Sequence, residues 1–248
     1  MTESVYAANV IPSALESLSS ALARHEVTAV VFDLDGTLAD SATDLMEGVR
    51  RSFRYYSLGE IPSTYLPAAL NGTMDGVMAD ACKAQGWPVP EDLSALKARF
   101  VDEYAEMAYP TTRLYPGAEA VLRLLRDAGI RTAVCTNSHA RNATELLNKL
   151  GILSYVEFVS GADTFGIQKP SPVPLLNTLA ELGVPEDQAL YVGDSVVDAL
   201  CAKEANVRFA WHEAGYGGDE PSTHPHFFKF HDWHRIGAEV SRHPSFSR

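Results

Sequence analysis

The sequence predicts an α/β fold: a Rossmann-like parallel sheet flanked by helices, with an inserted α-helical cap domain. Three observations predict it. Short apolar runs alternate with segments of helical periodicity, and most of the helical segments end at a glycine. A stretch of roughly 70 residues directly after the first apolar run contains no further run of that kind, which indicates a helical insertion. Such an insertion lies above the carboxyl ends of the strands, where ligands bind.

Five apolar runs predict the strands of the sheet. Residues 27–32 form a continuous, β-branched run, which is typical of a strand buried on both faces. The other runs cover residues 130–135, 156–159, 189–192 and 207–211.

Three helices are expected between these strands. They cover residues 118–128, 140–150 and 174–182, and they end at Gly129, Gly151 and Gly183. Ser138 is expected to cap the amino end of the middle helix. Each strand therefore leads into a helix that crosses back to the next parallel strand.

The two ends of the chain are expected to add to this core. Leu15, Leu18 and Leu22 recur at helical spacing, so a helix over about residues 12–25 is predicted to pack on the body, with dimerisation as the other interpretation. Residues 226–230 are expected to form an edge strand before a closing helix. The predicted domains are an N-terminal helical extension (1–26), a Rossmann-like core (27–41 and 113–248) and a helical cap (42–112).

Composition and charge narrow the classes of partner. Lys and Arg number 20 against 32 Asp and Glu, a net charge of −12, which argues against a nucleic-acid partner. No apolar run approaches the roughly 18 residues of a membrane helix, and residues 1–26 lack the basic start and apolar stretch of a targeting signal. Cys82, Cys135 and Cys201 are widely spaced, which indicates neither a disulfide framework nor a zinc site. A cytoplasmic setting is expected.

Polar side chains follow several of the predicted strands at the point where each strand ends. They are Asp33 and Asp35 after the first strand, Thr136, Asn137 and Ser138 after the second, and Asp194, followed by Asp198, after the fourth. Lys169 stands in a loop before a helix. Because the carboxyl ends of parallel strands meet at one edge, these groups are expected to converge. Carboxylates with one lysine and hydroxyl and amide donors fit a Mg²⁺ ion that holds a phosphoryl group.

The order of these motifs resembles that of the haloacid dehalogenase superfamily, over about residues 27–235. The matching motifs are Asp33-Leu34-Asp35-Gly36-Thr37-Leu38, Thr136-Asn137, Lys169-Pro170 and Gly193-Asp194-Ser195 with Asp198. Residues 33–45 and 169–172 look most like the phosphoglycolate phosphatase-like branch, which carries a helical cap after the first motif.

The resemblance implies a role for each motif residue. Asp33 would be the nucleophile that forms an aspartyl-phosphate, and Asp35 the acid/base that protonates the leaving oxygen and then activates water. Thr136 and Lys169 would hold the phosphoryl oxygens, with help from the Asn137 amide.

The same resemblance implies a Mg²⁺ site. Asp33, the Asp35 carbonyl and Asp194 would bind the ion. Asp198 would act on the ion indirectly, through the residues that bind it. A retained Asp35 suits phosphate esters, whereas a carbon–halogen hydrolase needs no such acid.

The cap is less informative than the core. Residues 71–76 occupy the place of a glycine-containing cap loop, so Gly72 and Thr73 are expected to contact substrate, and the loop is expected to close over it. The amino-acid sequence of this loop differs from the one expected in phosphoglycolate phosphatases, which leaves the identity of the substrate open. The candidates for a clamp on a substrate carboxylate are Arg50, Arg51, Arg54 and Lys83. Residues 211–218 are interpreted as a loop near the crevice rather than a phosphate cradle.

The leading hypothesis is a Mg²⁺-dependent phosphatase of a small phosphorylated, phosphoglycolate-like metabolite, acting as a monomer or homodimer. A phosphomutase of the β-phosphoglucomutase type shares every core residue. A phosphonate hydrolase would use Lys83 as a Schiff base, and a non-catalytic phospho-acceptor module would share the grouping of Asp, Thr and Lys. A second metal site is a further interpretation of the five C-terminal histidines, although strict ligand spacing is lacking: His224, His226, His231, His234 and His243.

Overall fold

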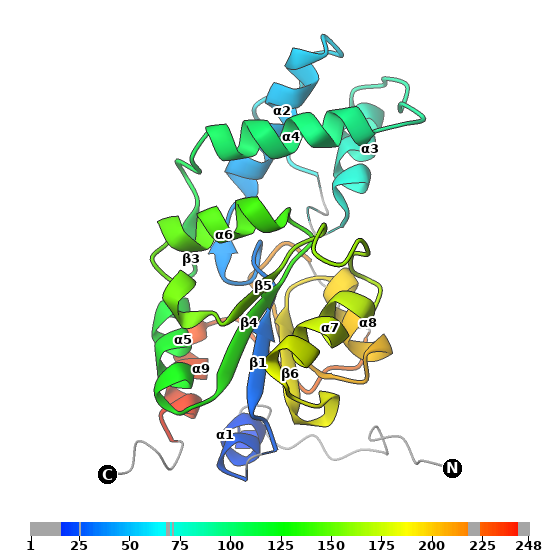
Figure 1. Cartoon of the computed structure of the whole chain (residues 1–248). Coiled ribbons are helices and arrows are strands. Elements are labelled where there is room, and N and C mark those ends of the chain that lie inside the picture. Colours follow the sequence, from blue (N-terminus) through cyan, green and yellow to red (C-terminus); the bar gives the residue numbers. More distant parts are fainter. Residues whose placement is uncertain (1–15, 25, 68–69, 71, 218–223, 243–248) are drawn as a thin grey trace.

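The computed structural model describes residues 16–24, 26–67, 70, 72–217 and 224–242 (Figure 1). Its centre is a six-stranded sheet in the order β5-β4-β1-β6-β7-β8, and every neighbouring pair is parallel. The strands are β1 (Ala29–Phe32), β4 (Arg131–Cys135), β5 (Phe158–Ser160), β6 (Ala189–Gly193), β7 (Arg208–His212) and β8 (Phe228–Phe230). The predicted fold class is confirmed.

Helices cover both faces of this sheet because its strands alternate their apolar side chains. Val30 and Phe32 of β1 face the core formed with α1 (Glu16–Ala23), α5 (Ala118–Asp127), α6 (Ala140–Lys149) and α9 (Trp233–Val240). Ala29 and Val31 face the opposite core, formed with α7 (Val173–Leu182) and α8 (Val196–Glu204). Leu18 and Leu22 of α1 are buried as expected, whereas Leu15 lies outside the described residues.

Several expected boundaries are wrong by a few residues. β1 begins at Ala29 rather than at residue 27, and β5 begins at Phe158 because a 3₁₀ turn, Leu153–Tyr155, precedes it. The residue at the amino end of α6 is His139, so Ser138 does not cap that helix. The edge strand is shorter than predicted, but β8 does lie at the end of the sheet and α9 follows it.

A second, two-stranded sheet was not predicted from the sequence. β2 (Ala39–Asp40) pairs antiparallel with β3 (Arg113–Leu114), and between them the chain forms α2 (Ala42–Tyr55), α3 (Met74–Ala84) and α4 (Ser94–Glu106). These helices lie beyond the carboxyl ends of the main sheet (Figure 1). The two short strands thus flank the helical segment, and they pair with each other where the chain enters and leaves it. The domain limits at residues 42 and 112 stay a prediction.

Asp44, near the start of the helical segment, binds the residues at the end of that segment. Its buried carboxylate accepts hydrogen bonds from the backbone N–H and the hydroxyl of both Thr111 and Thr112, at 2.7–3.3 Å. Burial acts to raise the pKa of Asp44, but these bonds outweigh it and the pKa is lowered. The first turn of α2 is therefore tied to the residues just before β3.

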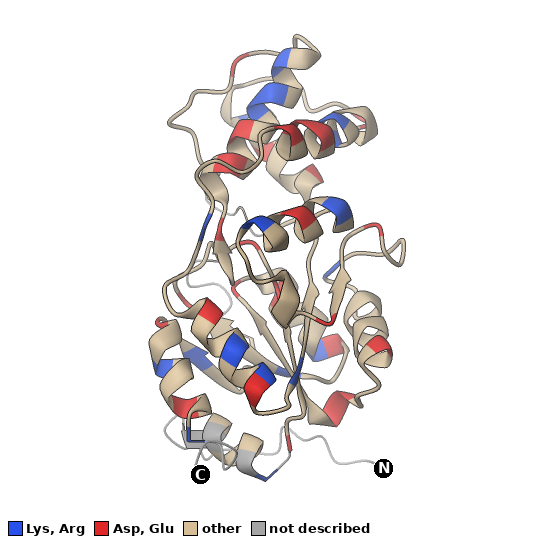
Figure 2. Cartoon of the chain, turned by 60° about the vertical axis from the view of Figure 1, so that its left-hand side comes forward, with Lys and Arg blue, Asp and Glu red and all other residues tan. Residues whose placement is uncertain are grey.

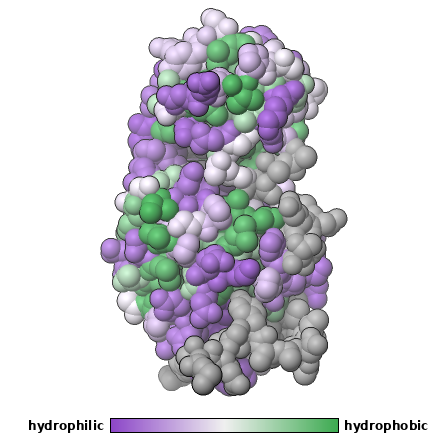
Figure 3. Space-filling view, turned by 90° about the vertical axis from the view of Figure 1, so that its right-hand side faces the viewer, coloured by the Kyte–Doolittle hydropathy of each residue, from purple (hydrophilic) through white to green (hydrophobic). Residues whose placement is uncertain are grey.

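The helices carry residues of both signs of charge. Lys and Arg are interspersed with Asp and Glu, and most of the central sheet is uncharged (Figure 2). On the face drawn in Figure 3, the hydrophobic groups of the described residues are interspersed with hydrophilic ones. None of the described helices combines the length and the apolar content needed to cross a bilayer.

Candidate active site

The end of β1 delivers two carboxylates to the carboxyl edge of the sheet. The Asp33 N–H donates to the Val192 carbonyl at 2.8 Å, so Asp33 still follows the line of the strand. The chain then turns at Gly36, which has a φ of +85°. A Cβ at Gly36 would lie 2.4 Å from the Asp194 Oδ2 atom. Only glycine fits this turn, because both the backbone angle and the close approach of Asp194 exclude a side chain.

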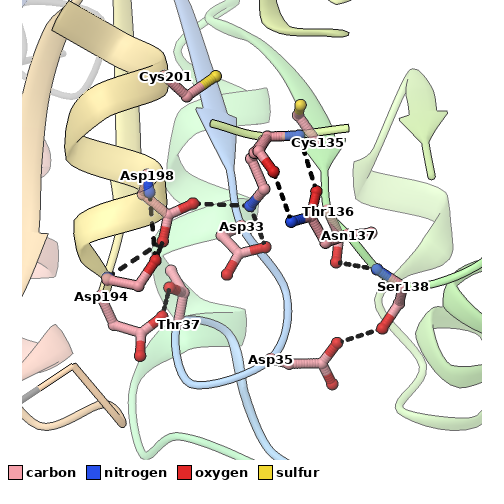
Figure 4. Close-up of polar contacts among 12 residues, drawn as sticks. Asp33, Asp35, Thr37, Cys135, Thr136, Asn137, Ser138, Asp194, Asp198 and Cys201 are labelled. Carbon is pink, nitrogen blue, oxygen red and sulfur yellow. Dashed lines mark hydrogen bonds and ion pairs between the residues drawn. The ribbon is translucent and has the colours of Figure 1, made fainter. Parts of the chain in front are cut away.

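Lys169 forms ion pairs with Asp33 and Asp198, two of the site residues that Figure 4 labels. Its Nζ atom is 2.8 Å from Asp33 Oδ1, 2.6 Å from Asp198 Oδ1 and 2.8 Å from the Tyr191 hydroxyl. Burial alone would lower the pKa of Lys169, but Asp198 and Asp33 raise it well above its usual value. Lys169 is therefore a buried, permanently charged cation that touches two carboxylates.

Three buried carboxylates lie close together in the site, and two of them contact Lys169. Oxygens of Asp33, Asp194 and Asp198 lie within 4.8 Å of one another. Burial raises the pKa of Asp33 to about 7, with Asp198 adding to it and Lys169 opposing it. Burial, together with Asp198 and Asp33, also raises the pKa of Asp194. Burial is the main cause of both shifts, and the neighbouring carboxylates add to it. Three buried carboxylate oxygens this close together could share a cation.

The three carboxylates differ in how many oxygens the protein already uses. Both oxygens of Asp198 accept hydrogen bonds, Oδ1 from Lys169 and Tyr191 and Oδ2 from the N–H and hydroxyl of Ser195. Asp194 accepts from the Thr37 hydroxyl at 3.1 Å and from the Tyr216 N–H at 2.6 Å. Asp33 Oδ2 has no hydrogen-bond partner among the described residues. Asp198 is thus arranged to orient Lys169, and Asp33 keeps one oxygen that no described residue uses.

Asp35 occupies a different environment from Asp33. The Ser41 hydroxyl donates to its Oδ1 at 2.5 Å and the Ser138 hydroxyl donates to its Oδ2 at 2.6 Å. Burial raises the pKa of Asp35 despite these two bonds. A carboxyl group with a raised pKa retains a proton closer to neutral pH, which is what a general acid requires. Ser138, expected to cap α6, instead holds this carboxylate.

The Asn137 side chain is placed differently from the expectation. Its amide nitrogen donates to the Lys169 carbonyl at 3.0 Å and its amide oxygen accepts from the Lys169 N–H at 2.9 Å. Both polar ends are therefore used to fix the Lys169 loop against the end of β4. Thr136 lies where expected, at the cavity, and its hydroxyl accepts from the Ser138 N–H at 3.1 Å.

A cavity of about 420 Å³ opens above these groups. Its floor is formed by the core residues Asp33, Asp35, Thr136, Asn137, Lys169 and Asp194. Its other side is formed by the helical segment, which contributes the apolar side chains Leu45, Val77, Phe100 and Val101 and the ion pair between Lys97 and Asp75, 2.8 Å apart. The cavity thus combines an ionic floor with a mixed apolar and charged roof.

The expected cap contacts are mostly not at this cavity. Gly72 lines it, but the Thr73 hydroxyl accepts from the Gly76 N–H and caps α3. Arg50 donates to the carbonyls of Pro62, Ser63 and Tyr65, so it holds a loop.

The remaining clamp candidates also lie away from the cavity. Arg51 and Arg54 pair with Glu47, and Lys83 pairs with Asp80 on the surface. Lys97 is the cation that the described part of the helical segment brings to the lining. A Schiff base at Lys83 has no support from this position.

Several residues of the site were missed from the sequence. Tyr191, Ser41, Tyr216 and Lys97 all contact or line it. Tyr216 alone had a signal, since it stands in the segment 211–218 that was placed near the crevice. The C-terminal histidines contribute no ligand to the one group of three His, Cys, Asp or Glu found in the described chain, and His243 lies outside that part.

Comparison with known proteins decides the family. The model of the family described as "Haloacid dehalogenase-like hydrolase" matches residues 30–212, which include all four motifs. The chain belongs to the haloacid dehalogenase-like hydrolases. The resemblance seen in the sequence is confirmed.

The relatives of this haloacid dehalogenase-like hydrolase include phosphoglycolate phosphatases. A phosphoglycolate phosphatase of Cereibacter sphaeroides is 35% identical over 210 residues, covering 82% of this chain and 94% of the relative. One from Rhodospirillum rubrum is 34% identical over 214 residues, covering 84% and 89%. The crystal structure of a predicted phosphoglycolate phosphatase from Haemophilus somnus superposes with a TM-score of 0.74 at 25% identity, covering 85% of this chain and 96% of the other. The predicted enzyme class, a phosphoric monoester hydrolase, is confirmed.

Proposed function

We propose that this protein hydrolyses the phosphate monoester of a small, phosphoglycolate-like metabolite with the help of Mg²⁺, through an aspartyl-phosphate on Asp33. The observation that carries the proposal is the position of Lys169, buried between Asp33 and Asp198 on the floor of a cavity. The cation offsets the repulsion between a carboxylate nucleophile and a phosphate dianion.

The carboxylate cluster fits a magnesium ion. Mg²⁺ prefers oxygen ligands and usually takes only one or two carboxylates. Asp33, Asp194 and the main-chain carbonyl of Asp35 would hold it, since Asp33 and Asp194 are buried and oxygens of Asp33, Asp194 and Asp198 lie within 4.8 Å of one another. When bound, the ion supplies positive charge that neutralises the phosphoryl oxygens.

The chain's own residues divide the reaction between them. An Asp33 carboxylate oxygen attacks phosphorus, and the bond from phosphorus to the ester oxygen breaks. Asp35 gives its proton to that leaving oxygen, while Lys169 and Thr136 donate hydrogen bonds to the phosphoryl oxygens. Asp35, now ionised, takes a proton from a water molecule, which attacks the phosphoryl group and releases Asp33 and inorganic phosphate.

Removal of the metal tests this proposal. We expect phosphate release from a panel of metabolite monoesters to fall to about a hundredth or less after EDTA treatment and to return with added Mg²⁺, because the uncompensated carboxylates would repel the substrate. Product analysis with sugar monophosphates distinguishes hydrolysis from a phosphomutase reaction. Full turnover in EDTA would contradict the metal requirement.

Lys97 is the candidate contact for the leaving group. Its ammonium has three donors, of which the Asp75 carboxylate takes one. Because both partners are partly exposed, their pairing is weak and leaves Lys97 free to bind a substrate carboxylate as well. This arrangement fits a phosphoglycolate-like substrate, as the names of the relatives suggest.

We therefore expect Lys97→Met to lower kcat/KM for phosphoglycolate about tenfold or more and kcat/KM for ethyl phosphate less than about twofold. Ethyl phosphate has no carboxylate, so it cannot use the ammonium. Lys83→Met is the matched control, because Lys83 is also a helical lysine paired with an aspartate but does not line the cavity. Equal losses on the two substrates would remove Lys97 from this role.

A further inference from the structure

The start of α2 departs from what its sequence favours. Ser41 and Asp44 have the spacing of a capping box, in which the serine hydroxyl accepts a hydrogen bond from the helix backbone. The same spacing does produce a capping box at α8, where Ser195 has φ −122° and ψ 162°. Ser41 has φ −117° and ψ 0°, and its hydroxyl caps no N–H of α2. The two serines differ in ψ, and this difference turns the Ser41 side chain elsewhere.

The Ser41 hydroxyl is directed at the proposed acid. It donates to Asp35 Oδ1 at 2.5 Å, opposite the bond from Ser138 to Oδ2. Each oxygen of the Asp35 carboxylate therefore has one hydroxyl partner, and these partners come from different parts of the chain. Asp44 would be the second residue of the capping box, but its carboxylate instead accepts hydrogen bonds from Thr111 and Thr112.

A tyrosine far along the sequence binds the backbone at the start of α2. The Tyr216 hydroxyl accepts from the Ser41 N–H at 2.6 Å and from the Ala42 N–H at 2.9 Å, and it donates to Asp40 Oδ1 at 2.9 Å. One donor and two acceptor positions are all that a phenol offers, so Tyr216 is fully used. Its own N–H is bound to Asp194 at 2.6 Å, which fixes Tyr216 to the floor of the site.

We propose that Tyr216 is a positioning residue for Asp35: its phenol oxygen holds the Ser41 backbone in the conformation that points the Ser41 hydroxyl at Asp35 rather than at the helix. The inference rests on the proposed function, in which Asp35 protonates the leaving oxygen. Without the phenol oxygen, the N–H groups of Ser41 and Ala42 lose their acceptor and no longer hold the Ser41 backbone. Ser41 is then free to take the extended ψ that Ser195 has, at which a serine hydroxyl caps its own helix, and this withdraws it from Asp35.

The test compares two substrates that differ in their need for a proton. The ethoxide of ethyl phosphate must be protonated as it leaves, whereas p-nitrophenolate leaves without a proton. In the Mg²⁺-loaded full chain, we expect Tyr216→Phe to lower kcat/KM for ethyl phosphate about tenfold and kcat/KM for p-nitrophenyl phosphate by less than about threefold. Ser41→Ala should show the same selective loss, and the double variant should lose no more than either single variant. Tyr109→Phe is the control, since its buried phenol contacts Asn142 and Glu145 and not Ser41.

Each outcome bears on the proposal. Equal losses on both substrates, or single losses that multiply in the double variant, would overturn it, because Tyr216 would then act through Asp194 or independently of Ser41. If Tyr216→Phe does not fold, Ser41→Ala decides: an unselective effect on the two substrates breaks the link from Ser41 to Asp35. A wild-type protein that hydrolyses neither these two esters nor phosphoglycolate refutes the proposed function itself, which is a different result from unselective variants.

Discussion

Asp33→Asn is expected to abolish phosphate release, lowering kcat by about four orders of magnitude or more. An amide is not a nucleophile toward phosphorus, and it is a poor ligand for a cation that the neighbouring carboxylates would still attract. Stopped assays with p-nitrophenyl phosphate measure the loss. Asp80→Asn is the control, because that exposed carboxylate pairs with Lys83 and does not line the cavity.

The same substitution is expected to raise the stability of the metal-free protein. Burial raises the pKa of Asp33 from 3.8 to about 7, so at pH 8 the folded state carries an ionised group that costs free energy which the unfolded state does not pay. Asparagine removes this cost, and Lys169 keeps Asp198 as a partner. The melting temperature in EDTA at pH 8 should therefore increase. A decrease would show that the Asp33–Lys169 ion pair outweighs the burial of the carboxylate.

Lys169→Met is expected to damage both activity and stability. Removing one member of a buried ionic group leaves Asp33 and Asp198 without their cation, which typically costs about 3–5 kcal/mol. Activity should fall by at least about a thousandfold, because the phosphoryl oxygens lose a fixed positive charge. Urea unfolding and turnover with p-nitrophenyl phosphate measure the two effects. Lys203→Met, on the exposed side of α8, is the control. A stable but inactive Lys169→Met protein would contradict the structural half of this prediction.

The core of the site could be predicted from the sequence because strand ends converge by topology. Asp33 and Asp194 follow apolar runs, and parallel strands place such residues at one edge whatever the details of packing. Lys169 follows no strand and could be assigned only through the family resemblance. The sequence pattern was sufficient for the sheet and most helices, but not for β2 and β3, which are two residues each.

The remaining contacts depend on side-chain directions that the sequence does not encode locally. Asn137 was expected at the phosphoryl group, yet its amide matches the main chain of Lys169 at two points. Ser138 is a residue type that often caps helices, but its hydroxyl instead donates a hydrogen bond to Asp35. Lys97 resembles any exposed helical lysine until the packing of α4 above the cavity is known. Tertiary structure, rather than local propensity, assigns each of these residues.

The most direct test of the account is to capture phosphate on Asp33. In the Asp35→Asn variant, which lacks the base that activates water, a single turnover of radiolabelled p-nitrophenyl phosphate stopped in acid should leave label on the protein. The label should be released by hydroxylamine, as expected for an acyl phosphate, and should map to the peptide that contains Asp33. Release of inorganic phosphate without any labelled protein, or label on another residue, would contradict the assignment of Asp33 as the nucleophile.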